Sequence, residues 1–164
     1  LQQVADETGM EVVIIRPPLV YGPGVKGNFA NLIKVVQKGI PLPLGAIKNQ
    51  RSLVAVDNLV DLIITCIDHS SAANQVFLAG DGQDLSTTEI LQEVAAAMGK
   101  PSRLIPVSQS LLMFVATLLG KRAVAQRLLG SLQVDISKAR DILGWEPPIS
   151  VQEGLRRCFE SKSN

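Results

Sequence analysis

The residues best suited to chemistry lie near the start of the chain, where Tyr21 precedes a run of glycines. Gly22, Gly24 and Gly27 fit the pattern G-x-G-x-x-G, which can hold a dinucleotide pyrophosphate when it joins a strand to a helix. Pro23 removes a backbone N–H from this turn, and no carboxylate follows at the expected spacing of about 20 residues. We therefore interpret these glycines as residues of tight turns rather than as a cofactor loop.

The other reactive side chains lack the partners that catalysis requires. Tyr21 is followed four residues later by valine and not by lysine, so we interpret it as a packed strand residue. His69 is the only histidine, no G-x-S-x-G motif is present, and we place this histidine at a helix end. Cys66 and Cys158 have no CxxC spacing and are expected to be reduced core residues in a reducing compartment. The sequence therefore predicts neither a catalytic residue nor a metal site in this chain.

Charge is unevenly distributed along the 164 residues, although the formal net charge is only +1. This balance predicts no general attraction to nucleic acid or to membranes. Between Val12 and Val56 the chain has cations and no carboxylate. The cations are Arg16, Lys26, Lys34, Lys38, Lys48 and Arg51. Such a stretch suits an anionic ligand, because nothing nearby repels it; a solvated face that is cationic by chance is the alternative.

Strands and helices alternate along the chain and must position these residues. Residues 1–9 are typical of the end of a helix, closed by Gly9. The strands that we expect, from their β-branched and apolar runs, cover residues 11–17, 51–56 and 75–80. The continuous β-branched run of the first is typical of a parallel strand buried on both faces. An amphipathic helix is expected at 28–38. The caps that we assign to later helices are Asp57, Ser86 with Glu89, Asp135, and Ser150 with Glu153. The alternation predicts an α/β fold, and the length predicts a single domain over residues 1–164.

The core faces and the longest apolar run complete this prediction. The helix after Asp57 should bury Leu59, Leu62, Ile63 and Cys66. The run LLMFVATLL, at residues 111–119, is too short for a transmembrane helix of about 20 residues, so we expect a helix that is either buried or faces a partner. Residues 1–11 contain acidic and no basic residues, unlike a secretory signal, and we expect a cytoplasmic protein.

Four segments of the chain, taken in order, resemble a known family. They are RPPLVYGPG, GNFANLIKVVQKGIPLPLG, NQRSLVAVDNLVDLI and VDISKARDILGWEPPISVQEGL. These segments resemble the carboxyl-terminal half of extended short-chain dehydrogenase/reductases, and they are most similar to nucleotide-sugar epimerases of the UDP-glucose or UDP-N-acetylglucosamine 4-epimerase type and to 4-keto-sugar reductases. The resemblance implies an α/β substrate-binding part with the last strands of a Rossmann-type parallel sheet. It also implies that NAD or NADP is bound mainly by an amino-terminal half that this chain lacks, together with the Tyr-x-x-x-Lys catalytic pair.

The resemblance also implies roles for particular residues. Asn28, at the start of a helix, matches an amide that contacts the substrate diphosphate, although it can equally cap the helix. Leu42 and Leu44 match the segment that holds the uracil. Arg51 matches an arginine that pairs with the diphosphate, and Arg127 is a weaker candidate for a second phosphate contact. An ion pair of Arg51 with Asp57 or Asp61 is the structural alternative.

The segment before the glycines both matches the family and departs from it. By analogy, the carbonyl groups of Pro17 and Pro18 would line the nicotinamide end of the cofactor. Leu19 stands where many members of the family have an asparagine that helps to hold the sugar nucleotide. This difference favours a substrate other than that of a standard galactose epimerase.

The function that the resemblance implies is UDP-sugar binding within an NAD(P)-dependent 4-epimerase or 4-keto-sugar reductase, with a homodimer compatible with the whole protein. Hydride transfer needs a positioned cofactor and a proton acceptor, so this chain alone is expected to be inactive. Two alternatives remain. One is a reductase of the same superfamily that acts on a steroid or flavonoid, and the other is a non-catalytic interaction module that docks through residues 111–119.

Overall fold

Two small sheets form the centre of the protein, whose computed structural model describes residues 7–24 and 27–160. β1 (Ile14–Arg16) pairs in parallel with β4 (Val76–Leu78). The second sheet has the order β2–β3–β5, and its strands are β2 (Leu19–Tyr21), β3 (Arg51–Ala55) and β5 (Asp84–Leu85). β2 is parallel to β3, whereas β5 is antiparallel to it.

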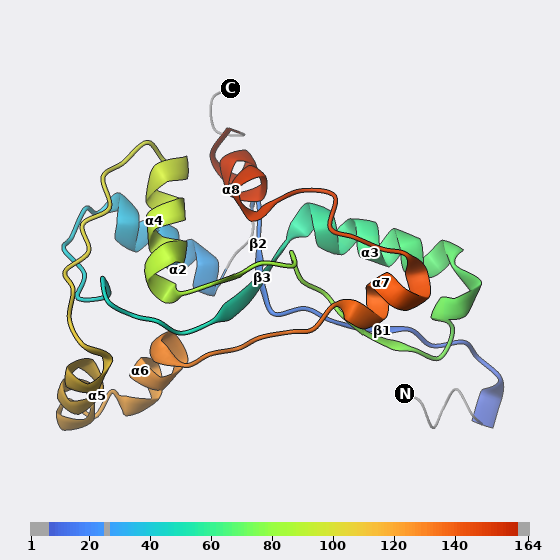
Figure 1. Cartoon of the computed structure of the whole chain (residues 1–164), viewed down its shortest axis with the longest axis horizontal. Helices are drawn as coiled ribbons and strands as arrows, with labels where there is room; N and C mark the ends of the chain where they lie inside the picture. Colours follow the sequence, from blue (N-terminus) through green and yellow to red (C-terminus); the bar gives the residue numbers. More distant parts are fainter. Residues whose placement is uncertain (1–6, 25–26, 161–164) are drawn as a thin grey trace.

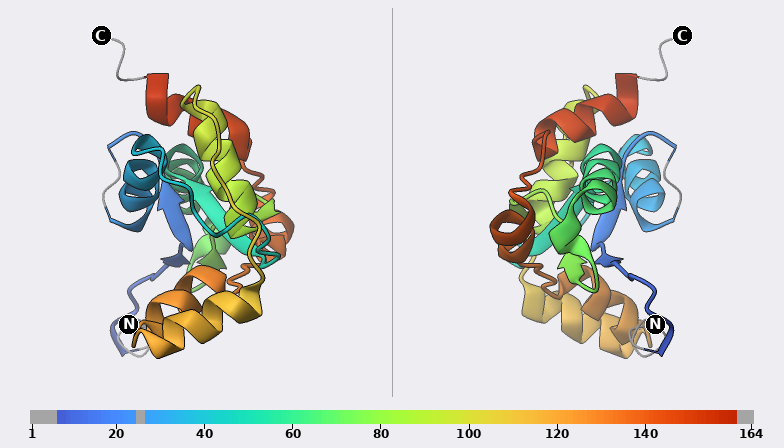
Figure 2. Two further views of the ribbon diagram at one scale, coloured as in Figure 1. Left: turned by 90° about the vertical axis from the view of Figure 1, so that its left-hand side faces the viewer. Right: turned by 90° about the vertical axis from the view of Figure 1, so that its right-hand side faces the viewer.

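Helices lie on both sides of the strands β2 and β3. They are α2 (Asn28–Gln37), α3 (Val56–Asp68), the 3-10 turn η1 (Ser70–Ala72), α4 (Thr87–Ala97), α5 (Gln109–Leu118), α6 (Arg122–Leu129), α7 (Ser137–Leu143) and α8 (Val151–Glu160). Figure 1 shows α2 and α4 to the left of β2 and β3, and α3 and α7 to their right. The α5 and α6 helices lie side by side at one end of the molecule (Figure 2). The predicted α/β class is confirmed.

β3 divides the core, because successive side chains of a strand point to opposite faces. Leu53 and Ala55 lie in one buried cluster, which also contains side chains of β2, α2, α4 and α8. Val54 lies in the other cluster, with side chains of α3, β4 and α7. Both faces of this strand are therefore covered, as its run of apolar residues predicts.

The first predicted strand is shorter and less buried than expected. It covers three residues and ends before Pro17, and Ile14 and Ile15 are only half-buried. Among the described residues β1 pairs with one strand only, so its other edge has no ladder partner there. The expectation of burial on both faces is therefore wrong for β1 in this chain.

The local signals for helix starts are mostly confirmed. Ser86 and Glu89 form both bonds of a capping box, with the Ser86 N–H donating to Glu89 Oε2 at 2.7 Å. The Glu153 N–H donates to Ser150 Oγ at 3.3 Å. Asp135 Oδ1 accepts from the Ser137 N–H at 2.8 Å, but the N-cap position of α7 is the residue after Asp135.

Two expectations about α3 are wrong, and one alternative for α5 is excluded. Asp57 is not a cap, because α3 begins at the residue directly after β3, with Ala55 as its N-cap, and Asp57 lies in the first turn. Ile63 is 40% exposed and does not belong to the core face of α3. α5, which covers most of the apolar run at 111–119, has no buried residue, so of the two predicted alternatives burial is excluded within the described structure and a partner-facing helix remains.

The capping box makes a pH-dependent contribution that can be measured. Hydrogen bonds from Ser86 lower the pKa of Glu89 below its usual value. A carboxylate with a lowered folded-state pKa stabilises the fold above its unfolded pKa, and this stability is lost as the pH falls through the folded value. We therefore predict that Glu89→Gln lowers the free energy of unfolding by about 0.3–1 kcal/mol at neutral pH and has no effect at about pH 2–3.

Urea denaturation across this pH range provides the measurement. Glu93→Gln, on the same helix but beyond its first turn, is the control and should not reproduce this pH dependence. An equal cost of Glu89→Gln at acidic and neutral pH would contradict the assignment.

Candidate functional site

The segment between α2 and β3 carries the two leucines predicted to contact a base. The Leu42 N–H donates to Arg103 O at 2.9 Å, and Leu42 O accepts from the Ile105 N–H at 2.7 Å. Leu44 O accepts from the Thr88 hydroxyl at 2.6 Å. Hydrogen bonds to the segment around residue 104 and to the start of α4 therefore fix the path of this backbone.

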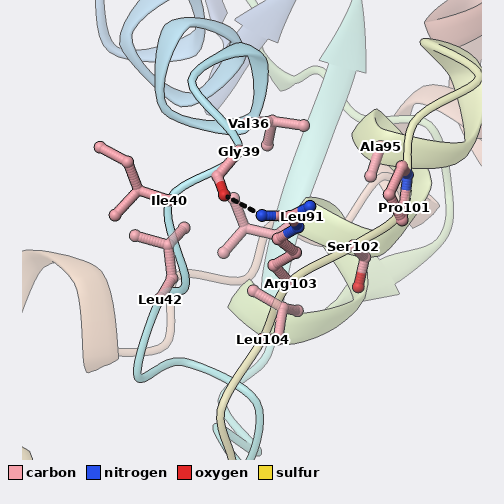
Figure 3. A pocket seen from close by; sticks show the side chains of 10 residues that line it. All are labelled: Val36, Gly39, Ile40, Leu42, Leu91, Ala95, Pro101, Ser102, Arg103 and Leu104. Atoms are coloured by element: carbon pink, nitrogen blue, oxygen red, sulfur yellow. Dashed lines mark hydrogen bonds between the residues drawn. The ribbon is translucent and has the colours of Figure 1, made fainter.

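Leu42 also lines a small pocket between the end of α2, the start of this segment and residues 101–104 (Figure 3). Val36 and Leu91 contribute apolar walls, and Arg103 Nη1 donates to Gly39 O at 3.3 Å. The cavity encloses about 20 Å³, which is room for about one water molecule. A uracil ring would therefore lie against the surface of this segment rather than inside the pocket.

Arg51 and Arg127 are brought together by the fold. Arg51 Nη1 donates to Arg127 O, in the last turn of α6, at 2.5 Å. Asn49 Nδ2 donates to Gly130 O at 2.9 Å, and Thr87 Oγ1 donates to Leu128 O at 2.7 Å. These side chains satisfy carbonyl groups that a helix leaves free at its carboxyl end. The two predicted phosphate contacts, 76 residues apart in the sequence, are thus neighbours.

The Arg51 guanidinium is half-buried, and its charge is paired with no carboxylate of the described residues. Burial lowers its pKa, but an arginine remains protonated at neutral pH. Asp57 pairs with Arg157 at 2.9 Å, and Asp61 Oδ2 accepts from Trp145 Nε1 at 2.8 Å. The predicted alternative, an ion pair of Arg51 with one of these aspartates, is therefore wrong. In the part of the chain that the structure describes, Arg51 has no ion pair with a carboxylate.

The place of Asn28 is described through its backbone alone. α2 begins at this residue and Gly27 precedes it without a side-chain cap bond. The Asn28 side chain, like residues 25 and 26, lies outside the described part of the structure. Its contact with a diphosphate, and its geometry relative to Arg51, remain predictions.

A partly buried polar cluster, which the sequence analysis missed, centres on Asp81. Tyr21 Oη donates to Asp81 Oδ2 at 2.6 Å. The Ala55 N–H and Asn58 Nδ2 donate to Asp81 Oδ1 at 2.9 and 2.7 Å. Burial raises the pKa of Asp81, and these donors partly oppose the rise. No short motif could have revealed this pairing, because 60 residues separate Tyr21 from Asp81.

Tyr21 is therefore a structural residue. Its side chain is fully buried in the core, as the sequence predicted. Burial, and then the negative charge of Asp81, raise the pKa of Tyr21 well above its usual value. A proton-transfer group works best with a pKa near the operating pH and must reach its substrate, and Tyr21 meets neither condition.

A second cavity has the wrong charge for a diphosphate. It encloses about 180 Å³ and is lined by Ser52, Asp84, Asp135 and Arg140 among others. Asp84 accepts hydrogen bonds from Ser52 Oγ at 2.5 Å and from Gln133 Nε2 at 2.6 Å. Two carboxylates and one guanidinium leave this site with a net negative charge, which repels an anion. This cavity is therefore not a candidate for the predicted diphosphate site.

Close packing and backbone conformation explain why Gly22 and Gly24, the described glycines of the G-x-G-x-x-G pattern at residues 22–27, are glycine. Gly22 has a φ of 156°, and a Cβ built there would lie 2.4 Å from Val56 Cγ1. Gly24 has a φ of 74°, which favours glycine. Pro17 and Pro18 join β1 to β2, the strand that leads into this loop, and Pro17 is exposed. Contact of these prolines with a nicotinamide stays a prediction.

Residues 7–24 and 27–160 contain neither a metal-binding cluster nor a membrane-spanning helix. No group of three or more histidine, cysteine, aspartate or glutamate side chains is arranged to hold a metal ion there. Within the same ranges no helix combines the length and apolar character needed to cross a bilayer. Both cysteines are free and buried, and His69 follows the last residue of α3, as predicted.

Comparison with known proteins places this fold and site in a family. The UDP-N-acetylglucosamine 4-epimerase of Bacillus cereus has a similar fold, with a TM-score of 0.72 and 15% identity over 99% of this chain and 50% of that one. The UDP-glucose 4-epimerase of Thermotoga maritima, solved with UDP-glucose, has a TM-score of 0.69 and 23% identity over 97% of this chain and 48% of that one. The fold is thus that of the carboxyl-terminal half of a Rossmann-type short-chain dehydrogenase/reductase.

The sequence comparisons agree with the fold. Residues 1–80 match the NAD dependent epimerase/dehydratase family. A UDP-glucose 4-epimerase of Vibrio cholerae is 54% identical over 98% of this chain and 49% of its own length. The chain is therefore similar to proteins of the NAD dependent epimerase/dehydratase family. It spans about half the length of the curated relatives it matches.

The Asp81 cluster gives a testable expectation for stability. Tyr21→Phe removes the donor to Asp81 Oδ2 and leaves a buried carboxylate oxygen without its partner. We predict a loss of about 1–3 kcal/mol in the free energy of unfolding, measured by urea denaturation at neutral pH. The loss should shrink when the same change is made in an Asp81→Asn background, because the buried charge is then gone. Equal losses in the two backgrounds would show that Tyr21 and Asp81 are not coupled.

Proposed function

We propose that this chain is the UDP-sugar-binding portion of an NAD(P)-dependent nucleotide-sugar 4-epimerase or 4-keto-sugar reductase. The observation that carries the proposal is the half-buried Arg51 guanidinium, which lies beside Arg127 and has no carboxylate partner among the described residues. A substrate diphosphate supplies the negative charge that this site lacks. A planar guanidinium can present two donors to phosphate oxygens, which a lysine cannot do.

The remaining contacts of the substrate follow from the same placement. Asn28 begins a helix of ten residues, and the free N–H groups and dipole at such a helix start favour a phosphate. Leu42 and Leu44 lie on the segment that leads from α2 to Arg51. A uracil bound along this segment would place the diphosphate that follows it in the substrate near Arg51. The N–H and carbonyl groups of Leu42 and the carbonyl group of Leu44 already bond the protein, so the apolar side chains of both leucines are left to contact the base.

The cofactor belongs to the complete enzyme. NAD or NADP accepts or donates the hydride at C4 of the sugar when bound. The described glycines of this chain do not fit a pyrophosphate-binding turn, because Gly22 packs against Val56 and Pro23 has no N–H. Pro17 and Pro18 are the residues of this chain that would border the nicotinamide. Without a cofactor loop or an available proton donor, this chain alone has no catalytic residue and no activity.

Two observations bear on the class of substrate: the similarity to one relative and the leucine at position 19. The similarity to a UDP-glucose 4-epimerase over almost the whole chain favours a nucleotide sugar over a steroid or flavonoid. Leu19 begins β2 and pairs with Leu53 of β3, two residues from Arg51 along that strand. An apolar side chain there, in place of the amide that many relatives of this type have, favours a substrate other than that of a standard galactose epimerase.

Replacement of Arg51 tests the proposal. Arg51→Lys keeps the charge but removes the paired donors, so we predict that it weakens UDP binding by the full-length protein by about ten- to a hundredfold. Isothermal titration calorimetry with UDP and UDP-glucose measures the effect. Arg156→Lys is the matched control, because Arg156 pairs with Glu153 and Glu160 on α8 and should leave affinity unchanged.

Three outcomes would contradict the assignment. Unchanged UDP affinity in Arg51→Lys would show that the guanidinium does not hold the diphosphate. The absence of any UDP affinity in the unaltered full-length protein would favour the interaction module. Tight binding of a steroid or flavonoid that is insensitive to Arg51→Lys would favour the other reductase.

A further inference from the structure

The pair of helices α5 and α6, with the turn between them, presents a large apolar surface that the described part of the molecule does not cover. We call residues 109–129 the α5–α6 hairpin. Its exposed apolar side chains are Leu111, Phe114, Val115, Leu118, Leu119 and Val124. Those of α5 recur at intervals of three and four residues, so they lie on one face of that helix. Phe114 is 61% exposed and Leu118 is 72% exposed. An apolar face of this kind marks a contact surface.

The charge around the hairpin is of one sign. Between Glu93 and Asp135 the sequence contains basic residues and no carboxylate. The basic residues are Lys100, Arg103, Lys121, Arg122 and Arg127, and all of them are exposed. Lys121 and Arg122 directly follow the apolar residues Leu118 and Leu119 across the Gly120 turn. Along the sequence, the charged residues next to the hairpin are thus cations alone.

This combination identifies the class of partner. A second copy of the chain would bring the same cations against each other, and like charges oppose such a contact. An anionic lipid surface attracts the cations and accepts the apolar side chains. α5 has ten residues and is about 15 Å long, half of the hydrocarbon thickness of about 30 Å, so it can lie in the interface but cannot cross it. We propose that the α5–α6 hairpin binds the surface of an anionic membrane.

The proposed membrane contact lies next to the candidate site. Arg51 and Asn49 donate hydrogen bonds to the carbonyl groups of residues 127, 128 and 130, at the end of α6. The α5 and α6 helices extend from this point to one end of the molecule, apart from α3 and α7 (Figure 2). A hairpin bound to a membrane would therefore hold the anion site close to the lipid surface. The overall charge of +1 does not oppose this contact, because the carboxylates lie elsewhere in the sequence. The membrane proposal does not depend on which anion the site takes.

Sedimentation with lipid vesicles tests the membrane contact. The probes are vesicles of phosphatidylcholine with about one-third phosphatidylglycerol, and vesicles of phosphatidylcholine alone. We expect the protein, both as this chain and at full length, to bind the anionic vesicles at least about tenfold better than the neutral ones. The preference should disappear in about 0.5 M salt, where the charges are screened.

Two variants and one control separate the contributions. Phe114→Glu and the pair Lys121→Glu with Arg122→Glu should each reduce binding to anionic vesicles by at least about tenfold. Ile67→Glu makes the same charge change at a side chain of α3 that is 76% exposed, and should bind as the unaltered protein does. Circular dichroism checks that each variant is folded.

Several results would overturn the proposal. The first is the absence of binding to anionic vesicles, or binding that Phe114→Glu leaves unchanged. Equal binding to neutral and anionic vesicles would show that the basic residues do not contribute to the contact. A dimer that dissociates in Phe114→Glu would assign the surface to a second copy. Binding by this chain that is lost at full length would show that another part of the protein covers the hairpin.

Discussion

The carboxylate of Asp81 is the point on which the arrangement of the strands depends. Asp81 lies between β4 and β5, and its backbone N–H donates to Leu53 O of β3 at 2.8 Å. Its oxygens accept bonds from Tyr21 of β2, from Ala55 at the end of β3 and from Asn58 of α3. A buried carboxylate is costly without such donors, so the three elements must stay in register for the charge to be tolerated.

The same cluster extends to α8 and fixes the space available there. Asn58 Nδ2 donates to Ile149 O at 2.9 Å, and Asn58 Oδ1 accepts from the Ile149 N–H at 3.1 Å, just before α8. A Cβ at Gly154 would lie 2.7 Å from Tyr21 Oη, so only glycine allows α8 to approach β2 this closely. These contacts fix the carboxyl end of β3 and so the orientation of the strand. Arg51, at the amino end of β3, therefore lies beside the end of α6.

Local sequence signals predicted much of this fold, and contacts between distant residues supplied the rest. The capping box at Ser86 and the glycine end of α7 are encoded within a few residues, and both were predictable. The predicted cap at Asp57 was wrong because β3 passes directly into α3 with no loop between them, which places Asp57 in the first turn of the helix. The exposure of Phe114 could not be predicted, since an apolar run is equally compatible with burial and with a contact surface. The pairing of Tyr21 with Asp81 has no local signal at all.

In the candidate site, too, local sequence signals predicted one part and contacts between distant residues supplied the other. Residue type and local charge indicated an anion site around Arg51, and a family resemblance was needed to add Arg127; the fold then places the two together. A crystal structure of the full-length protein with UDP tests the central claim most directly. We predict phosphate oxygens within about 3 Å of guanidinium nitrogens of both Arg51 and Arg127. A diphosphate seated elsewhere, with Arg51 bonded only to the carbonyl group of residue 127, would contradict this account.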